Sequence, residues 1–444
     1  MTFTATQSAL VLGGDPAGLT AALLLTSHGY HVTVIDRRLP IGGTATREDP
    51  SGPPEPFTIL GCHRATRSLL ASLHPQTQQP LETEIPLEFQ LLNNSLVHYP
   101  RSSFPAPLHT WVSLLKFTGM PWKERWRLAS WVEQLWEGDE ELPADLEQRT
   151  ADEWLASVEQ NARTRRVVWS PIARWLTGND LSTISADAFI TSLRPFFLRT
   201  RSDSRISVVQ NSLQTCLVRP MIERLTQLGA TILGNPEAIQ LRYQQDRISS
   251  VLLQDGSELQ ADWYVAALPP HELTPLLPER WMTRYAYFQQ LTELRSVDSM
   301  IVWVDAEQSC ATSRLILLND PSFHSVLAAP TVHDHTVFSL VTTDNQLSQP
   351  HPDTDPDLIP LDLLRSLELL RPDSGISSIR RRIRPSGILS LKPGTKSHRP
   401  IQRSPIANLL VAGAWTDTGW PPNLESAIVS GNRCAEAIAS DGPT

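Results

Sequence analysis

The first 36 residues alternate between apolar runs and glycine turns. The apolar run Ser8–Leu12 precedes a glycine turn, and the apolar stretch Ala17–Leu25 then ends at Gly29. A β-rich run follows over His31–Ile35, closed by Asp36. Apolar residues at helical spacing between two short β-rich runs predict a strand, a helix and a second strand, as in the βαβ unit of a parallel sheet.

The glycine turn of this unit is where a Rossmann fold holds a dinucleotide. Backbone N–H groups and a helix N-terminus face the pyrophosphate, and an acid about 20 residues further on binds a ribose. Gly13 and Gly18 fit the first and third positions of G-x-G-x-x-G, and Asp36 lies 23 residues after Gly13. Asp15 stands where the second glycine lets the phosphates approach the backbone. A turn that binds no nucleotide is the alternative interpretation of this fragment.

A second pair of glycines, Gly42 and Gly43, follows six residues after Asp36. Paired glycines let a loop pass close to another part of an extended dinucleotide, a need found more often in flavin enzymes than in nicotinamide enzymes. An ordinary turn explains the pair equally well when it is taken alone.

The C-terminus repeats the strand, loop and helix pattern. Leu409–Ala412 predicts a buried strand, Gly413–Pro422 a loop and Asn423 the start of a helix, with Glu425, Asn432 and Glu436 pointing mostly away from the packed face. The free N–H groups at this helix start suit the electron-rich pyrimidine edge of a reduced flavin.

Elements between the two ends are less regular. Ile248–Leu253, the Asp255–Gly256 turn and Trp263–Ala267 predict a strand, a hairpin turn and a strand, and Asn211–Leu228 has helical spacing. The stretch 351–360, rich in Pro and Asp, predicts an exposed loop.

Composition narrows the class of protein. The 444 residues are 41% hydrophobic and 19% charged, which fits a folded chain, and the net charge of −9 argues against a nucleic-acid-binding protein. No signal peptide or membrane span is predicted. The four cysteines lie too far apart to suggest a zinc site or a disulfide framework, and the His333–His335 triplet has no third ligand at metal spacing. We therefore expect a cytoplasmic protein with no metal site.

Two surface hypotheses remain open from the sequence. Five of the 13 tryptophans fall within residues 111–136, where Lys116, Lys123, Arg125 and Arg127 are interspersed. This region is either core packing or a basic amphipathic helix in peripheral contact with the inner face of the cytoplasmic membrane. The basic run Arg380–Arg384 predicts a solvated strand face or turn, with an anionic contact as the alternative.

The N-terminal fingerprint, the glycine pair and the segment AGAWTDTGWPPNLESAIVSG (412–431) together resemble the FAD-dependent amine oxidase and phytoene desaturase superfamily. Within it, the chain most resembles squalene-associated desaturases, the group that includes hydroxysqualene dehydroxylase. The segments LGCHRATRSLL (60–70) and VVWSPIARWLTGNDLSTISADAFITSL (167–193) carry further resemblance.

The resemblance implies an α/β fold in which an FAD-binding Rossmann-like domain of the GR2 type is interleaved with an α+β substrate domain. The implied FAD-binding segments are 1–75, 206–275 and 386–444, and the implied substrate segments are 76–205 and 276–385. The implied cofactor-binding residues are Gly13, Gly14, Asp15, Ala17, Gly18, Asp36, Arg37, Gly42, Gly43, Thr44, Ile239, Gly413, Ala414, Trp420, Pro421, Asn423, Leu424 and Glu425.

The implied activity is that of an FAD-dependent oxidoreductase acting on a squalene- or carotenoid-like polyprenyl, of the desaturase or dehydroxylase type, with amine oxidation as a second alternative. No catalytic residue is assigned, because the isoalloxazine ring carries the redox chemistry of such enzymes.

Three positions depart from the family pattern. Besides Asp15, Ala414 stands where relatives commonly carry Asp, and Glu55–Phe57 replaces a glycine and histidine before the LGC segment. A lost charge-assisted hydrogen bond costs about 1.5–3 kcal/mol. The alternative hypothesis is therefore a flavin-poor or inactive member that serves as a binding or scaffold protein.

Overall fold

The computed structural model describes residues 7–43, 55–75, 82–105, 108–128, 143, 145–331, 334–343 and 357–441. Thr44 and His333, and with them Trp131 and Trp136, lie outside the described residues.

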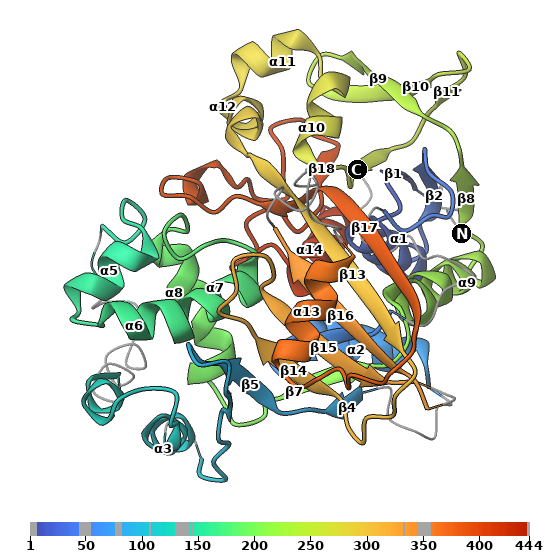
Figure 1. The fold of residues 1–444 in the computed structure, drawn as a ribbon. Helices are drawn as coiled ribbons and strands as arrows, with labels where there is room; N and C mark the ends of the chain where they lie inside the picture. Colours follow the sequence, from blue (N-terminus) through green and yellow to red (C-terminus); the bar gives the residue numbers. More distant parts are fainter. Residues whose placement is uncertain are drawn as a thin grey trace.

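A five-stranded parallel sheet gathers strands from four separate regions of the chain. Its order is β18–β12–β1–β2–β8, and every neighbouring pair is parallel. The bounds are β1 (Ser8–Leu12), β2 (His31–Asp36), β8 (Thr231–Gly234), β12 (Trp263–Ala266) and β18 (Leu409–Val411). The predicted α/β class, with its N-terminal βαβ unit, is confirmed (Figure 1).

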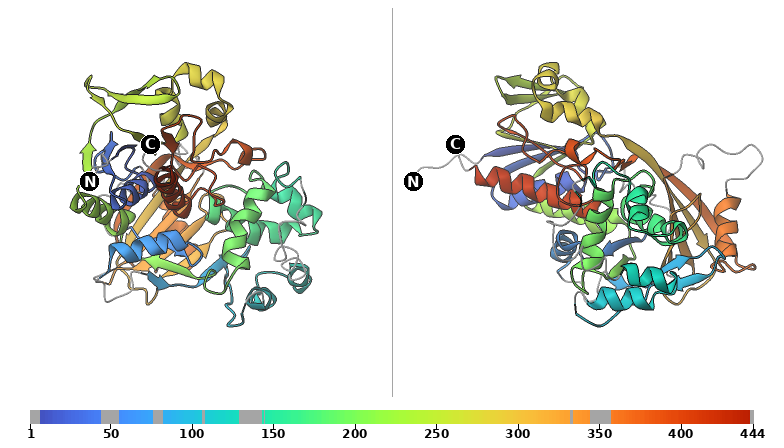
Figure 2. Two further views of the ribbon diagram at one scale, coloured as in Figure 1. Left: turned by 180° about the vertical axis from the view of Figure 1, so that it is seen from behind. Right: turned by 90° about the vertical axis from the view of Figure 1, so that its left-hand side faces the viewer.

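Helix α1 (Pro16–Ser27) and helix α14 (Leu424–Ser440) pack side by side against this sheet (Figure 2). Their closest approach is at Gly431, where a Cβ atom would lie 2.3 Å from the carbonyl oxygen of Ala17. Helices α9 (Arg219–Gln227) and α2 (Arg64–Leu73) pack against α1 and α14 respectively. Both helices that were predicted to approach a cofactor therefore lie together.

A separate antiparallel ribbon corrects one sequence prediction. The Asp255–Gly256 turn joins β10 (Arg247–Leu253) to the short β11 (Glu258–Leu259), and β9 (Ala238–Gln244) completes the sheet. The expected partner strand, β12, belongs instead to the parallel sheet. The run Trp263–Ala266 is buried at every position, so it fits between two parallel strands better than at an exposed hairpin edge.

A seven-stranded sheet, here called sheet C, forms the other half of the molecule. Its order is β17–β13–β16–β15–β14–β5–β6. The bounds are β5 (Leu87–Gln90), β6 (Leu96–His98), β13 (Ser296–Ala306), β14 (Arg314–Leu317), β15 (Ser325–Pro330), β16 (Thr336–Thr342) and β17 (Ile376–Leu389). One face is covered by α13 (Leu358–Ser366), against which Val302 and Val304 pack (Figure 2). Alternate residues therefore point to the opposite face.

The remaining elements surround these sheets. A small sheet joins β3 (Phe57–Leu60), β7 (Ile206–Val209) and β4 (Glu82–Glu84). Helices α3 (Leu108–Lys116), α5 (Ala151–Ser157), α6 (Ala162–Thr164), α7 (Ser170–Thr177) and α8 (Ala186–Leu193) lie on the side away from α9 (Figure 1). Helices α10 (Pro270–Leu273), α11 (Glu279–Arg284) and α12 (Ala286–Gln289) follow β12. Within the described residues, none of the helices combines the length and the apolar character needed to cross a bilayer.

Candidate active site

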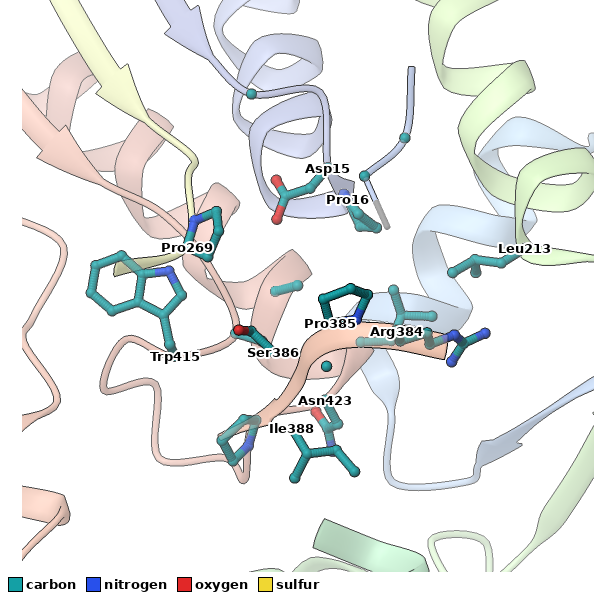
Figure 3. A pocket seen from close by; sticks show the side chains of 18 of the residues that line it. Asp15, Pro16, Leu213, Pro269, Arg384, Pro385, Ser386, Ile388, Trp415 and Asn423 are labelled. Carbon is teal, nitrogen blue, oxygen red and sulfur yellow. The ribbon is translucent and has the colours of Figure 1, made fainter. Parts of the chain in front are cut away.

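A cavity of about 1260 Å³ extends from the parallel sheet to the inner face of sheet C (Figure 3). Segments from both ends of the chain line it. The predicted cofactor residues among its lining are Gly13, Asp15, Asp36, Arg37, Gly42, Gly43, Ile239, Ala414, Asn423 and Leu424. The fold therefore brings ten of the predicted residues to one cavity.

Three glycines, two of them at fingerprint positions, hold the turn at its start. A Cβ atom on Gly13 would lie 2.2 Å from the carbonyl oxygen of Ala267, and one on Gly18 would lie 2.1 Å from the oxygen of Gly13. A Cβ atom on Gly14 would lie 2.2 Å from a methyl carbon of Ile41. These distances leave no room for side chains, so the glycines set the shape of the turn beside the cavity. Gly14, Ala17, Gly18 and Gly413 support the cavity wall without lining it.

Asp36 holds the turn from the end of β2. Its carboxylate accepts hydrogen bonds from the Gly14 N–H at 2.8 Å and from the Arg38 N–H at 2.9 Å. The side chain is buried and lines the cavity at the carboxyl edge of the sheet. This is the place where an open parallel sheet binds ligands, and where an acid meets a ribose in dinucleotide folds.

Asp15 is the N-cap of α1. Its backbone is extended, and its carboxylate accepts a hydrogen bond from the Gly18 N–H at 2.8 Å. Desolvation by the surrounding protein, together with the nearby charge of Asp36, raises the pKa of the Asp15 carboxyl to about 7, against the opposing effect of the Gly18 hydrogen bond. The second fingerprint position thus holds a carboxyl that titrates near neutral pH.

A second helix N-terminus meets the same cavity. Asn423 caps α14, accepting a hydrogen bond from the Ser426 N–H at 2.9 Å, and Leu424 and Ala427 line the cavity beside it. The Ser426 hydroxyl donates to the carbonyl of Ala414 at 3.0 Å. The start of α14 and the preceding loop are therefore fixed relative to each other.

The loop before α14 is also fixed by Arg399, which the sequence did not single out. Its guanidinium donates to the carbonyls of Ala414, Trp415 and Thr416 at 3.2, 3.2 and 2.6 Å. Burial lowers the pKa of Arg399 to about 10. Trp415, also missed, lines the cavity and donates from Nε1 to the Leu268 carbonyl at 3.1 Å. Trp415 follows directly after Ala414, a predicted cofactor residue, and this adjacency could have indicated its place in the cavity.

Glu425 corrects a prediction. It does not line the cavity, and its carboxylate accepts bonds from the N–H of Ala65 and the N–H and hydroxyl of Thr66, at 2.9, 2.9 and 2.7 Å. It is buried, not solvated as the helical pattern suggested, because it caps the N-terminus of α2. Trp420 and Pro421 also lie outside the lining, and Trp420 packs edge-on against His63 at 5.8 Å.

The other end of the cavity is the inner face of sheet C. Its lining is mainly apolar and comes from alternate residues of four neighbouring strands: Ile301, Trp303, Leu315, Leu327 and Val341. Ser325 and Ser339 add hydroxyl groups to this face, and Trp175 and Ile388 border it.

The basic run on β17 is not a solvated strand face. Arg382 forms a bidentate pair with Glu55 at 2.8 and 2.6 Å, and its guanidinium lies 4.9 Å from the ring centre of Trp303. Burial, and then the charge of Arg382, lower the pKa of Arg384, which lines the cavity, to about 10. Alternation along the strand turns these side chains inward. Glu55, one of the departures from the family pattern, thus has a charged partner.

Comparison with known proteins decides the family. Residues 16–439 match the family described as flavin containing amine oxidoreductase. The chain belongs to this family. As a member of the flavin containing amine oxidoreductase family, it is an FAD-dependent oxidoreductase.

Among curated relatives, it is 25% identical to 15-cis-phytoene desaturase of Synechococcus elongatus, over 96% of this chain and 95% of that one. It is 26% identical to zeta-carotene desaturase of Synechocystis, over 67% of each chain. Among solved structures, a triple mutant of putrescine oxidase matches with a TM-score of 0.73 at 17% identity, covering 98% and 99% of the two chains. Cyclohexylamine oxidase from Brevibacterium oxydans matches with a TM-score of 0.71 at 17% identity, with the same coverage. These structural likenesses show the fold.

The residues of the cavity fit an FAD molecule. Two helix N-termini and a glycine-rich turn face its sheet end, and these features suit an anionic pyrophosphate. Bound FAD supplies two-electron oxidation, accepting a hydride equivalent from a substrate. The protein's part would be to hold the cofactor, to position a substrate beside it and to exclude water. Asp15 is the lining carboxylate that stands at the turn itself, where its charge opposes the cofactor's pyrophosphate.

Proposed function

We propose that the chain acts on a squalene- or carotenoid-like polyprenyl in a redox reaction of the desaturase or dehydroxylase type. The same proposal places FAD on the ten predicted residues that line the cavity, with its pyrophosphate at Gly13–Gly18 and its flavin at the start of α14. In a desaturation the substrate would lose two hydrogens, as a hydride and a proton, and the FAD would gain the two electrons.

The observation that carries this proposal is the apolar extension of the cavity. FAD accounts for the sheet end, while the face formed by Ile301, Leu315, Leu327 and Val341 remains for a substrate. Small-molecule pockets usually measure about 300–1,000 Å³. A volume of about 1260 Å³ exceeds this range, which favours room for a second apolar molecule beside a dinucleotide. The two curated relatives compared above are named for carotenoid desaturation, which supports the same substrate class.

Charge in the substrate end disfavours the amine alternative. Arg174 and Arg384 line this part of the cavity, and the carboxylate of Glu55 is paired with Arg382. An ammonium group entering beside two guanidinium groups would meet like charge in a desolvated space. A neutral polyprenyl carries no such cost.

Peripheral membrane contact is part of the proposal, because a polyprenyl dissolves in lipid. The exposed apolar side chains around α3 and the helix at 122–128 are here called the tryptophan patch: Phe104, Leu108, Trp122 and Trp126. Their exposed fractions are 51%, 52%, 56% and 48%, and Lys116 and Lys123 are exposed beside them. Basic residues beside exposed tryptophans suit an anionic membrane surface, here the inner face of the cytoplasmic membrane.

The test is anaerobic mixing of FAD-loaded protein with candidate substrates, followed by flavin absorbance in a single turnover. We expect 15-cis-phytoene in vesicles to bleach oxidised flavin and to yield a product two hydrogens poorer. A hydroxylated squalene-type substrate should instead reoxidise flavin that has been reduced beforehand, because replacing its hydroxyl by hydrogen consumes two electrons and releases water. Putrescine is the matched amine control and should leave the flavin oxidised. Reduction by putrescine, together with no reduction by any polyprenyl, would contradict the proposal.

A further inference from the structure

We propose that Asp15 must be protonated for FAD to bind, so that the protein takes up one proton as the pyrophosphate enters. The inference rests on the use of FAD and on the geometry of the α1 turn. It does not depend on which substrate is oxidised.

The Asp15 carboxylate already occupies the position of an anion at the start of α1. It accepts the Gly18 N–H at 2.8 Å, one of the backbone donors that a helix N-terminus offers to a phosphate. It lines the cavity, with its oxygens directed toward the side where Pro269 lies (Figure 3). A Cβ atom on Gly43 would lie 3.3 Å from the Asp15 Cβ, so the glycine-pair loop closes over the same spot.

Like charge makes the ionised form of Asp15 incompatible with a diphosphate at this turn. Asp36 and Glu272 already disfavour ionisation of Asp15, and desolvation is the larger cause of its raised pKa of about 7. A further anion at the turn would raise the pKa of Asp15 again. A protonated Asp15, in contrast, has an O–H that donates a hydrogen bond to a phosphate oxygen.

The neighbouring cations are already engaged. Arg37 contacts Glu272 at 2.8 Å and Glu237 at 3.4 Å, and Arg38 also pairs with Glu272. His271 on α10 lies 3.7 Å from Glu272 and is the histidine nearest to these carboxylates among the residues that line the sheet end of the cavity. Glu55, Arg174, His324 and Arg384 line the substrate end of the cavity. Because His271 lies close to the same carboxylates, the experiment includes a variant that distinguishes its contribution from that of Asp15.

The experiment measures the Kd of FAD for the apoprotein by quenching of flavin fluorescence at several pH values from about 6 to about 8.5. If one carboxyl with a pKa near 7 must be protonated, Kd should rise about 30-fold over this range, approaching tenfold per pH unit at the alkaline end. Calorimetry at about pH 8 in two buffers of different ionisation enthalpy should count about one proton taken up per FAD.

Three variants assign the proton. Asp15→Asn keeps a good N-cap and removes the titration, so its Kd should stay flat with pH and match the wild type at the acid end. The Kd of FAD for Asp15→Gly should also be independent of pH. His271→Gln should keep the full pH dependence of the wild type.

A flat Kd profile in the wild type, or no proton uptake by calorimetry, would overturn the inference without touching the proposed substrate class. A pH dependence of the FAD Kd that persists in Asp15→Asn, or that disappears in His271→Gln, would also overturn the inference. Because calorimetry uses the wild-type protein, the inference stays testable even where a variant fails to fold. Failure of the polyprenyl substrates to bleach bound flavin is a separate result that bears on the function alone.

Discussion

At the residue scale, Asp15 and Glu425 place carboxylates at helix N-termini with different consequences. Asp15 caps its own helix, α1, beside the cavity. Glu425 belongs to α14, but its side chain caps the neighbouring helix α2 through three hydrogen bonds. Helix N-termini favour negative charge in both places. At Asp15, desolvation and the charge of Asp36 oppose the negative charge of the carboxylate. Asp15 and Glu425 are therefore tested by different experiments.

Asp15 makes the stability of the apoprotein depend on pH in an unusual direction. Its pKa is 3.8 when unperturbed and about 7 in the folded protein, so the native state binds the proton more tightly. Stability from this group is present at low pH and is lost as the pH rises from about 4 to about 7. Urea unfolding of Asp15→Asn against wild type should show an advantage of the variant that grows across this range and then levels off. An advantage independent of pH would contradict the assignment.

Glu425 should contribute to stability and not to cofactor chemistry. In Glu425→Gln the charge is lost and an amide N–H₂ meets backbone donors, so we expect a loss of about 2 kcal/mol in the free energy of unfolding of the apoprotein. The measurement is the midpoint of urea unfolding, compared between proteins whose free energy of unfolding depends equally on urea concentration. Glu436→Gln, an exposed change on the same helix, should alter stability by less than about 0.5 kcal/mol. Equal effects of the two changes would argue against the capping role.

The residue-scale predictions from sequence succeeded where a backbone rule applies. Gly13 and Gly18 occupy backbone contacts that admit no Cβ atom, and the fingerprint spacing indicates this directly. Glu425 was misplaced because helical periodicity describes only the faces of its own helix. The approach of α2, from residues 64–73, depends on tertiary packing that no local pattern contains.

At the element scale, β17 pairs with β13 and turns alternate arginines to opposite faces. Arg382 faces Glu55 with side-chain exposures of 17% and 9%, whereas Arg381 faces Asp357 with exposures of 30% and 52%. A charged pair with little exposure is costly to break because one partner is left buried and unpaired.

We therefore expect Arg382→Met to lower the free energy of unfolding by about 3–5 kcal/mol. Arg381→Met on the same strand should lower it by less than about 1 kcal/mol. Adding Glu55→Gln to Arg382→Met should recover part of the loss, because the buried carboxylate that keeps only Arg380 at 4.0 Å is then removed. A double variant whose loss equals the sum of the single losses would show that the pair does not act as a unit.

The tryptophan patch gives the element-scale test of membrane contact. Trp122 and Trp126 are exposed on the helix at 122–128, with ring centres 5.8 Å apart. Replacing both by Ala should weaken binding to vesicles of phosphatidylglycerol and phosphatidylcholine by about tenfold or more, as measured by co-sedimentation. Ile401→Ala, a change at a side chain 59% exposed elsewhere, is the control and should leave binding unchanged. If the tryptophan variant binds vesicles as well as the wild type does, the membrane hypothesis is wrong and this region serves core packing or another role.

Elements with strict local signals were predictable. The glycine turn, α1 and the start of α14 are as the sequence indicated, because capping and periodicity are local properties. Sheet C was not foreseen as a seven-stranded unit, since its strands come from residues 87–98 and 296–389 and pair across long stretches of chain. The Asp255–Gly256 turn was found, yet its hairpin partner was wrong, because a turn does not specify which later strand pairs.

At the scale of the whole molecule, the two sheets meet at one cavity. The interleaved segments inferred from the sequence stay a proposal, and β17 runs across the predicted boundary at residues 385 and 386. The site could be predicted in its dinucleotide half, where motifs are local. Its substrate half could not, because Trp303, Leu327 and Ser339 face the cavity only through the register of sheet C.

The central claim is that this one cavity holds FAD at the parallel sheet and an apolar substrate against sheet C. Leu327 lines the sheet C end and lies on β15, away from the glycine turn. The most direct test is therefore Leu327→Trp, which fills the substrate end. The measurement is the anaerobic rate of flavin reduction by the polyprenyl that reduces the wild type, with the FAD Kd measured in parallel. We predict an unchanged FAD Kd, which also reports a folded protein, together with loss of most of the reduction rate. An unchanged reduction rate in the FAD-loaded variant would contradict the claim.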